Sequence, residues 1–290
     1  MVHARNIDPL ALVAAGPRRS KHFRRRVLAL GVFASVSAGL AFAGRAATVR
    51  PPPCRLSGDA TGVVTAVSDG DTVVLDGERI VRLAAVTAPK DGDTPMSGDL
   101  AEASRRRLEA LVLDRTVVVQ GRGGRQDRYG RTVAHLSLAT DGTWVEQSLV
   151  REGWARVVTG PQEGPCAVAL LGVEEEARRS ERGVWARPEF AVRSATGGSL
   201  AEDRDRFVVV AGRVYSVRRA GRLTYINFGA DHSRSLTATL LTSDEKLFIN
   251  YGKDPASLVG QRVEMRGWIG DRGGPTMSLS HPDEIVVIGK

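Results

Sequence analysis

The feature that most constrains the fold is a series of short β-branched and apolar runs separated by Asp-Gly pairs. The runs cover residues 61–67, 72–75 and 79–86, and the Asp-Gly pairs stand at 69–70 and 76–77. Runs of this kind with Asp-Gly between them predict antiparallel strands joined by tight turns. We therefore expect a three-stranded meander at the start of the folded region.

The following segments alternate between helical and strand-like patterns. Apolar residues recur at helical spacing in three of them, and β-branched runs continue the strands around the polar loop 121–131. The expected helices span 98–113, 144–152 and 167–182, and the expected strands span 115–120 and 132–138. This order of elements predicts an α+β chain that is mainly β, in which helices cap a five-stranded barrel of the OB type over residues 61–190.

A change of composition precedes the last third of the chain. Residues 191–205 are rich in Ser, Gly, Ala and charged residues, which is typical of a linker. Strand patterns resume after it, with one short helix or turn at 254–258. The expected strands are 207–217, 223–229, 236–241, 262–269 and 285–288. We expect them to form a second, small β-barrel-like domain over residues 206–290.

The formal charge of +8 is concentrated at the start of the chain. The first 50 residues hold nine of the 41 Lys and Arg residues but one of the 33 acidic residues. The other 240 residues carry 32 of each sign, so the net charge does not indicate a nucleic-acid-binding surface on the folded part.

The first segment has the pattern of an export signal. A basic stretch at 18–26 precedes an apolar run at 27–43 that closes with small residues. This predicts a signal peptide over residues 1–43, of the twin-arginine or the Sec type, followed by a Pro-containing tether over 44–60. An uncleaved membrane anchor is the alternative, and only then would the membrane be a partner. We expect a periplasmic or secreted protein.

Cys54 and Cys166 are the only cysteines. In an exported protein an even pair favours a disulfide, here between the tether and the loop before the helix at 167–182. Two unpaired thiols are the alternative. Metal binding by these residues is not expected, because no histidine lies at ligand spacing from either cysteine.

Four short motifs carry the chemistry that the sequence shows. They are Asp69-Gly70-Asp71-Thr72-Val73, Val81-Arg82-Leu83, Val86-Thr87-Ala88-Pro89-Lys90 and Asp127-Arg128-Tyr129-Gly130-Arg131. Each alone occurs in many β proteins. Their order, with strands and a helix between them, resembles the staphylococcal nuclease (thermonuclease) family, and the resemblance covers about residues 61–187. No GxSxG, HExxH or P-loop motif offers another catalytic site.

The resemblance implies specific roles. In that family two aspartates hold calcium, two arginines clamp the phosphate, and a glutamate handles the attacking water; hard cations take oxygen ligands and guanidinium groups pair with phosphate. By position, Asp71 resembles the first calcium ligand, and Arg82 and Arg131 resemble the catalytic phosphate clamps. Arg128 and Tyr129 lie on the same loop as Arg131 and are further phosphate-binding candidates.

The chain departs from the family at two positions. Thr87 stands where the second aspartate is expected, and Lys90 stands where the glutamate is expected. Lys90 then joins the phosphate-binding candidates. The tyrosines expected after the helix at 144–152 are also absent from 157–161. We therefore expect an exported protein that binds a phosphodiester or another anion, with weak or lost hydrolysis and with calcium, at Asp71, only as a candidate cofactor.

Three alternatives remain open at this point. A shifted loop that recruits Asp91 or Asp93 would give a working calcium-dependent nuclease acting on DNA or RNA. Asp71 would otherwise form a buried ion pair with Arg82 or Arg131. In the third alternative the protein is a non-enzymatic envelope protein, whose C-terminal domain contacts a protein partner.

Two further features are ambiguous. The basic loop 121–128 contacts a nucleic-acid backbone or is a solvated hairpin loop. Tyr225, Phe228 and Trp268 are interpreted as core aromatics, and a base-stacking surface is the alternative.

Overall fold

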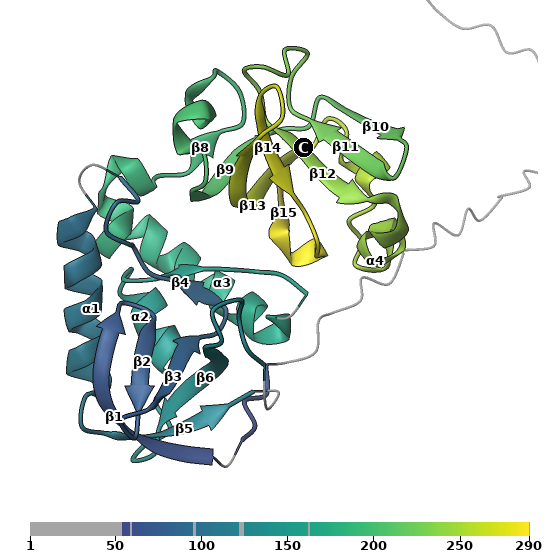
Figure 1. Ribbon diagram of the computed structural model, residues 1–290. Helices are drawn as coiled ribbons and strands as arrows, with labels where there is room; N and C mark the ends of the chain where they lie inside the picture. Colours follow the sequence, from purple (N-terminus) through teal and green to yellow (C-terminus); the bar gives the residue numbers. More distant parts are fainter. Residues whose placement is uncertain (1–53, 59, 95–96, 122–124, 162, 290) are drawn as a thin grey trace, which may run out of the picture. The chain divides into compact units, whose positions relative to one another are not determined.

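The computed structural model describes residues 54–58, 60–94, 97–121, 125–161 and 163–289 (Figure 1). The predicted signal peptide, and with it the membrane-anchor alternative, lies outside these residues. Within the described ranges no helix is long and apolar enough to cross a membrane.

Five strands close into a barrel in the order β1-β2-β3-β6-β5. They are β1 (Ala60–Asp69), β2 (Thr72–Leu75), β3 (Arg79–Leu83), β5 (Thr116–Gln120) and β6 (Thr132–Leu138). The first three form the predicted antiparallel meander, and the parallel pairing of β3 with β6 completes the closure. The predicted α+β class with an OB-like barrel is confirmed.

Three helices accompany the barrel: α1 (Gly98–Val112), α2 (Val145–Arg151) and α3 (Gly164–Arg179). Side chains of β1–β3 such as Val64, Leu75 and Val81 are fully buried and share one apolar cluster with Leu108 of α1 and Leu149 of α2. The alternation of buried and exposed residues along β1 shows why a half-buried strand forms there.

A two-stranded ribbon lies beside the barrel. Strand β4 (Val86–Thr87) pairs antiparallel with β7 (Arg156–Val157), so that Thr87 is opposite Arg156. This pairing brings the motif after β3 next to the segment before α3. Neither two-residue strand was predicted as a separate element, because so short a run carries no periodicity.

The C-terminal strands form one eight-stranded sheet, whereas the sequence predicted a small barrel-like domain. They are β8 (Arg193–Ser194), β9 (Phe207–Arg213), β10 (Ser216–Ala220), β11 (Leu223–Asn227), β12 (Thr237–Leu241), β13 (Arg262–Asp271), β14 (Pro275–Ser278) and β15 (Ile285–Gly289). The ten-residue β13 pairs with β9, β14 and β15 and is the centre of the sheet.

The sheet also carries elements that the sequence patterns did not indicate. Helix α4 (Glu245–Asn250) is too short for a periodic signal. The segment 191–205, expected to be a linker, contains β8, which pairs with β9, and the Arg193–Asp203 ion pair at 2.9 Å. Six 3-10 helices complete the described chain: η1 (Gly183–Ala186), η2 (Pro188–Phe190), η3 (Ser199–Asp203), η4 (Thr242–Asp244), η5 (Pro255–Leu258) and η6 (Pro282–Glu284).

The barrel with its helices (the barrel lobe, residues 54–190) packs directly on the C-terminal sheet (the sheet lobe, residues 191–289). Arg266 of β13 is buried and donates to Oε2 of Glu174 at 2.8 Å and to the Val157 carbonyl at 3.0 Å. Both lobes also share an apolar cluster that contains Trp185 and Val209. The lobes are thus joined by a buried ion pair as well as by apolar contact.

The predicted disulfide between Cys54 and Cys166 is confirmed. Helix α3 begins at Gly164, so Cys166 lies in its first turn rather than in the preceding loop. The bridge fixes the start of the described chain to this helix across a sequence separation of 112 residues.

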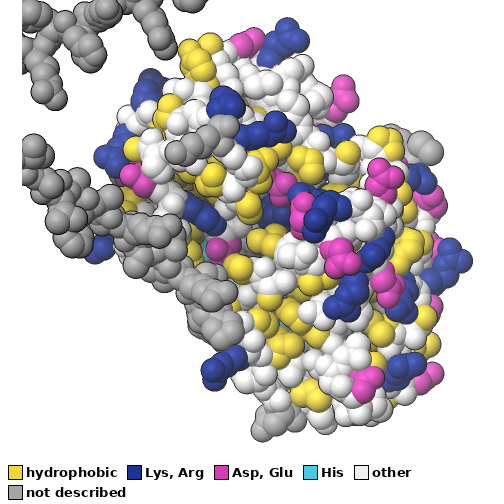
Figure 2. Space-filling model, turned by 180° about the vertical axis from the view of Figure 1, so that it is seen from behind, with side chains coloured by type: hydrophobic (Ala, Val, Ile, Leu, Met, Phe, Trp, Pro, Cys, Tyr) yellow, Lys and Arg dark blue, Asp and Glu magenta, His cyan; other side chains and the backbone are white. Residues whose placement is uncertain are grey.

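Charges of both signs are mixed over the surface that Figure 2 shows. Lys and Arg side chains alternate there with Asp and Glu side chains over the described residues. This agrees with the even charge balance of the chain after residue 50. A cationic character, where it occurs, is therefore local.

His135 on β6 and Glu146 on α2 form a buried pair, with 3.1 Å between Nδ1 and Oε1. Burial alone would lower the pKa of His135, but the charge and hydrogen bond of Glu146 raise it above its ordinary 6.5. A raised folded pKa stabilises the fold fully below pH 6.5, and this stabilisation is lost as the pH rises through the folded pKa.

We therefore expect the free energy of unfolding of the wild type, relative to that of His135→Gln, to fall between pH 6 and pH 9. Urea unfolding of both proteins across this range measures the difference. Parallel pH profiles would show that the pair carries no such linkage.

Candidate functional site

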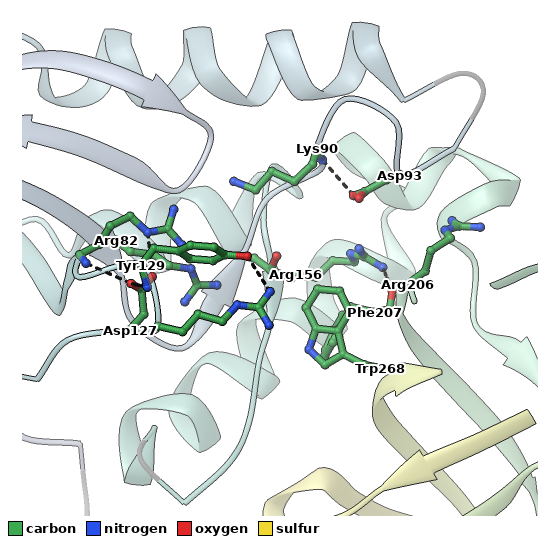
Figure 3. Close-up of a pocket in the computed structure, with 12 residues that line it drawn as sticks. Arg82, Lys90, Asp93, Asp127, Tyr129, Arg156, Arg206, Phe207 and Trp268 are labelled. Carbon is green, nitrogen blue, oxygen red and sulfur yellow. Dashed lines mark hydrogen bonds and ion pairs between the residues drawn. The ribbon is translucent and has the colours of Figure 1, made fainter. Parts of the chain in front are cut away.

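A pocket of about 480 Å³ lies between the barrel lobe and the sheet lobe (Figure 3). Its lining residues are Arg82, Thr87, Lys90, Asp93, Asp127, Arg128, Tyr129, Arg131, Arg156, Arg206, Phe207 and Trp268. Six of these side chains are cationic and two are acidic, so the pocket has a net positive formal charge. An excess of positive charge in a pocket attracts anions.

All five residues predicted to bind phosphate line this pocket: Arg82, Lys90, Arg128, Tyr129 and Arg131. They come from β3, the segment after β4, and the loop before β6. The fold therefore brings the separate motifs to one place. Asp71, the predicted metal ligand, is fully buried and reaches the site through Lys90.

Lys90 places its ammonium between two carboxylates. Its Nζ lies 2.7 Å from Oδ2 of Asp69 and 2.7 Å from Oδ1 of Asp71. The other oxygen of Asp71 accepts the backbone N–H of Ala88 at 2.8 Å. Burial would raise the pKa of Asp69, but the charge and hydrogen bond of Lys90 hold it below its usual value. One ammonium of the protein itself thus pairs with both carboxylates, so one positive charge faces two negative charges.

The alternative that Asp71 pairs with Arg82 or Arg131 is wrong, because the partner of Asp71 is Lys90. Arg82 donates instead to the Val86 carbonyl at 3.1 Å, and Arg131 pairs with Asp127 at 2.7 Å. The sequence pattern did not indicate that Lys90 would fold back onto the Asp-Gly-Asp turn, because 19 residues separate it from Asp71.

The donor set does not fit calcium. Calcium takes six to eight oxygen ligands, commonly with several carboxylates. Here Lys90 already holds the two carboxylates of the turn, and Thr87 offers a neutral hydroxyl where a carboxylate would be needed. Across the described ranges no group of three or more His, Cys, Asp or Glu residues is placed to hold a metal ion.

Asp91 and Asp93, the alternative carboxylates, lie differently. Asp93 lines the pocket, and its Oδ2 accepts the backbone N–H of Lys90 at 2.9 Å. Asp91 is exposed and points toward the first residue of α1, since a Cβ placed on Gly98 would lie 3.3 Å from its Oδ1. Of the two, Asp93 is the carboxylate that a ligand in the pocket would meet.

Asp127 organises the loop that carries Tyr129 and Arg131. Its Oδ1 accepts the backbone N–H groups of both residues, at 2.9 and 3.0 Å, and its Oδ2 accepts Nε of Arg131 at 2.7 Å. Burial would raise the pKa of Asp127, but the hydrogen bonds from Arg131 hold this pKa below its ordinary value. The turn also needs the positive φ of 77° at Gly130. These contacts therefore hold the loop backbone and orient the Arg131 side chain.

Tyr129 is 67% exposed and is flanked by two guanidinium groups. Arg128 lies 4.8 Å and Arg131 5.3 Å from the centroid of its ring, within cation–π distance. A planar aromatic surface and two guanidinium groups thus lie together at the pocket.

Arg156 is a site residue that the sequence analysis missed. It is 5% exposed and donates from Nη1 to the Phe207 carbonyl at 2.8 Å, and its Nε has no hydrogen-bond partner within the described structure. Its guanidinium lies between the rings of Phe190 and Phe207, at 4.9 and 5.3 Å. Burial lowers the pKa of Arg156 to about 10, so it stays charged at neutral pH. The sequence offered one signal for it, because Arg156 is the single charged residue in the otherwise apolar run 154–158.

The interpretation of Trp268 as a core aromatic is wrong, because this side chain is 57% exposed and lines the pocket. The interpretation is right for Phe228, which is buried in the sheet core. Tyr225 is half-buried, with Arg218 over its ring at 5.9 Å. Strand alternation alone cannot show which exposed face of a sheet borders a second lobe.

Comparison with known proteins gives a family match over part of the chain. Residues 80–187 match the family described as "Staphylococcal nuclease homologue". A "Micrococcal nuclease" of Shigella flexneri is 33% identical over 142 residues, which are 45% of this chain and 76% of that protein.

Two other relatives align over similar lengths. A "Probable endonuclease LCL3" of Schizophyllum commune is 31% identical over 143 residues, or 45% of this chain and 46% of that protein. "Endonuclease YncB" of Bacillus subtilis is 26% identical over 138 residues, or 46% of this chain and 64% of that protein. The chain thus spans less than two thirds of both proteins, and the family match ends before the sheet lobe.

Replacement of Lys90 tests the ion pair directly. In Lys90→Met the buried Asp71 loses its cation, and a buried charge without its partner is costly. Since Asp71 keeps the Ala88 hydrogen bond and Lys90 is partly exposed, we expect a loss of about 1–2 kcal/mol in the free energy of unfolding.

Urea unfolding measures this loss, and Lys246→Met, at an exposed position of α4, is the matched control. The control should change stability by less than about 0.5 kcal/mol. Equal stability of the two variants would show that the Lys90 contacts contribute nothing.

Proposed function

Because this chain belongs to the staphylococcal nuclease homologue family, we propose that it is an exported nuclease-like protein that binds phosphodiesters or related anions with little or no calcium-dependent hydrolysis. The observation that carries the proposal is the Lys90 ammonium, 2.7 Å from a carboxylate oxygen of Asp69 and of Asp71. The expected signal peptide and the Cys54–Cys166 disulfide support export.

Anion binding follows from the groups that face the pocket. Arg82 and Arg131 carry planar guanidinium groups suited to phosphate oxygens, and Asp127 orients Arg131. Arg156 adds a buried cation with an Nε that lacks a partner in the described structure. A phosphate that enters the pocket would therefore meet several positive groups without needing a metal.

The proton acceptor that hydrolysis requires is missing at the position where the family has a glutamate, because this chain has Lys90 there. A lysine ammonium has three donors and no lone pair, so Lys90 in its ion pairs cannot take a proton from water. Loss of a general base costs about 10² to 10⁴ in rate. Thr87 and Lys90 together therefore favour binding over cleavage.

A second candidate is a working nuclease in which Asp93 supplies the carboxylate. The observation in its favour is that Asp93 lines the same pocket as Arg82 and Arg131. Cleavage by the wild type that is lost in Asp93→Asn would establish this candidate. Asp91→Asn is the matched control and should keep the cleavage, because Asp91 is exposed and lies outside the pocket lining.

Restoration of the family's carboxylates tests the proposal. We expect the full chain to leave single-stranded DNA and RNA intact in millimolar calcium, while Thr87→Asp combined with Lys90→Glu gains calcium-dependent cleavage of at least about 100-fold. Calcium should also raise the melting temperature of the double variant but not that of the wild type, because only the double variant offers several carboxylates that lack a lysine partner.

Lys246→Glu, which makes the same charge change as Lys90→Glu but at an exposed position of α4, should gain neither property. Calcium-dependent cleavage by the wild type would overturn the proposal in favour of a working nuclease.

Arg131→Ala tests binding. In a buffer with chelator, this variant should bind fluorescein-labelled single-stranded DNA about tenfold more weakly than the wild type, because one charge-assisted phosphate contact is lost. The slope of log Kd against log salt concentration should also fall by about 1, the value expected for the loss of one phosphate contact. Arg222→Ala, at an exposed position away from the pocket, should change neither quantity. Identical affinities for the two variants would place the binding surface elsewhere.

A further inference from the structure

The sheet lobe supplies an exposed indole to the pocket. Trp268 is 57% exposed, whereas the other three tryptophans of the chain are buried or half-buried. A large aromatic left in contact with water inside a recessed site is unusual, since burying it would stabilise the fold. Its position therefore calls for a ligand that takes the place of water.

The orientation of this indole is fixed by the strands beneath it. Trp268 on β13 is directly opposite Phe207 on β9 in the sheet register. The two rings meet edge to face, with 5.8 Å between centroids. Phe207 is itself buried, and its ring and carbonyl both contact Arg156. The exposed ring thus stands on a rigid support rather than on a loop.

A second exposed ring faces the pocket from the barrel lobe. Figure 3 shows Tyr129 with Arg82 and Asp127 on one side and Trp268 with Phe207 on the other. Both rings line the pocket together with the cations already described. Arg131 lies beside the Tyr129 ring, and Arg156 lies beside Phe207 on the side of Trp268. Two separated aromatic surfaces, each with a cation nearby, match the chemistry of a single nucleic-acid strand, in which bases alternate with phosphates.

We infer that Trp268 is a base-stacking subsite, contributed by the sheet lobe, for a single-stranded oligonucleotide whose phosphates lie at Arg82, Arg131 and Arg156. The inference rests on the proposed anion-binding function of this pocket. It extends the site beyond residues 80–187, to which the family match is limited. Tyr129 offers a surface for a second base, and duplex DNA, whose bases are already stacked, has no base to give to Trp268.

The test compares two probes and four proteins. The full-length wild type, Trp268→Ala, Trp268→Phe and Tyr215→Ala are titrated, in chelator, against a labelled twelve-nucleotide oligothymidylate and against an abasic strand of the same length. Tyr215 is the matched control, since it is an exposed aromatic of the same lobe outside the pocket lining.

We expect Trp268→Ala to bind oligothymidylate about 5- to 100-fold more weakly, the loss typical of one stacked base, and to bind the abasic strand as the wild type does. Trp268→Phe should recover most of the affinity, because a flat ring remains. Tyr215→Ala should bind both strands as the wild type does.

Wild-type affinity of Trp268→Ala for oligothymidylate would overturn the stacking subsite while leaving the phosphate site in place. Equal weakening of both strands would also overturn it, since the loss would then not involve a base. Failure of the wild type to bind either strand would overturn the proposed function as well.

Discussion

The buried contact between Arg266 and Glu174 is the interaction on which the pocket depends. Glu174 accepts the backbone N–H of Val157 at 2.6 Å, and Arg266 donates both to Glu174 and to the Val157 carbonyl. The two side chains therefore hold both polar groups of one residue in β7. Removing one partner of such a buried pair typically costs about 3–5 kcal/mol, because the other charge is left without compensation. The Arg266–Glu174 pair therefore positions β7, and with it the neighbouring Arg156 that lines the pocket.

The same network explains why the family segment and the additional sheet form one site. Arg178 of α3 pairs with Glu264 of β13 at 2.8 Å, and Glu264 also accepts from Arg266. Charged groups that would be costly to bury singly are thus satisfied across the boundary between the lobes. As a result, Arg206, Phe207 and Trp268 of the sheet lobe line a pocket whose other lining residues come from the barrel lobe.

The function proposed for that pocket depends on Lys90. A lysine stands where the family resemblance implies a glutamate, and its ammonium pairs with both Asp69 and Asp71. A positive charge beside the two carboxylates is thus part of the chain itself. The proposed function follows from this arrangement, because an ammonium binds anions but has no lone pair with which to take a proton from water.

The sequence by itself determined the local elements and the identity of the family motifs. Asp-Gly turns set the meander, and helical spacing set α1. Two cysteines in a chain expected to be exported predicted their disulfide. Each of these signals acts over a few residues or rests on composition. Only the tertiary structure decided that Lys90 pairs with the Asp69–Asp71 turn, that Arg156 is buried beside the pocket, and that Trp268 is exposed within it. These outcomes depend on contacts between segments 19 to more than 100 residues apart. Periodicity cannot report such contacts, because it records which face of an element is apolar and not what lies opposite that face.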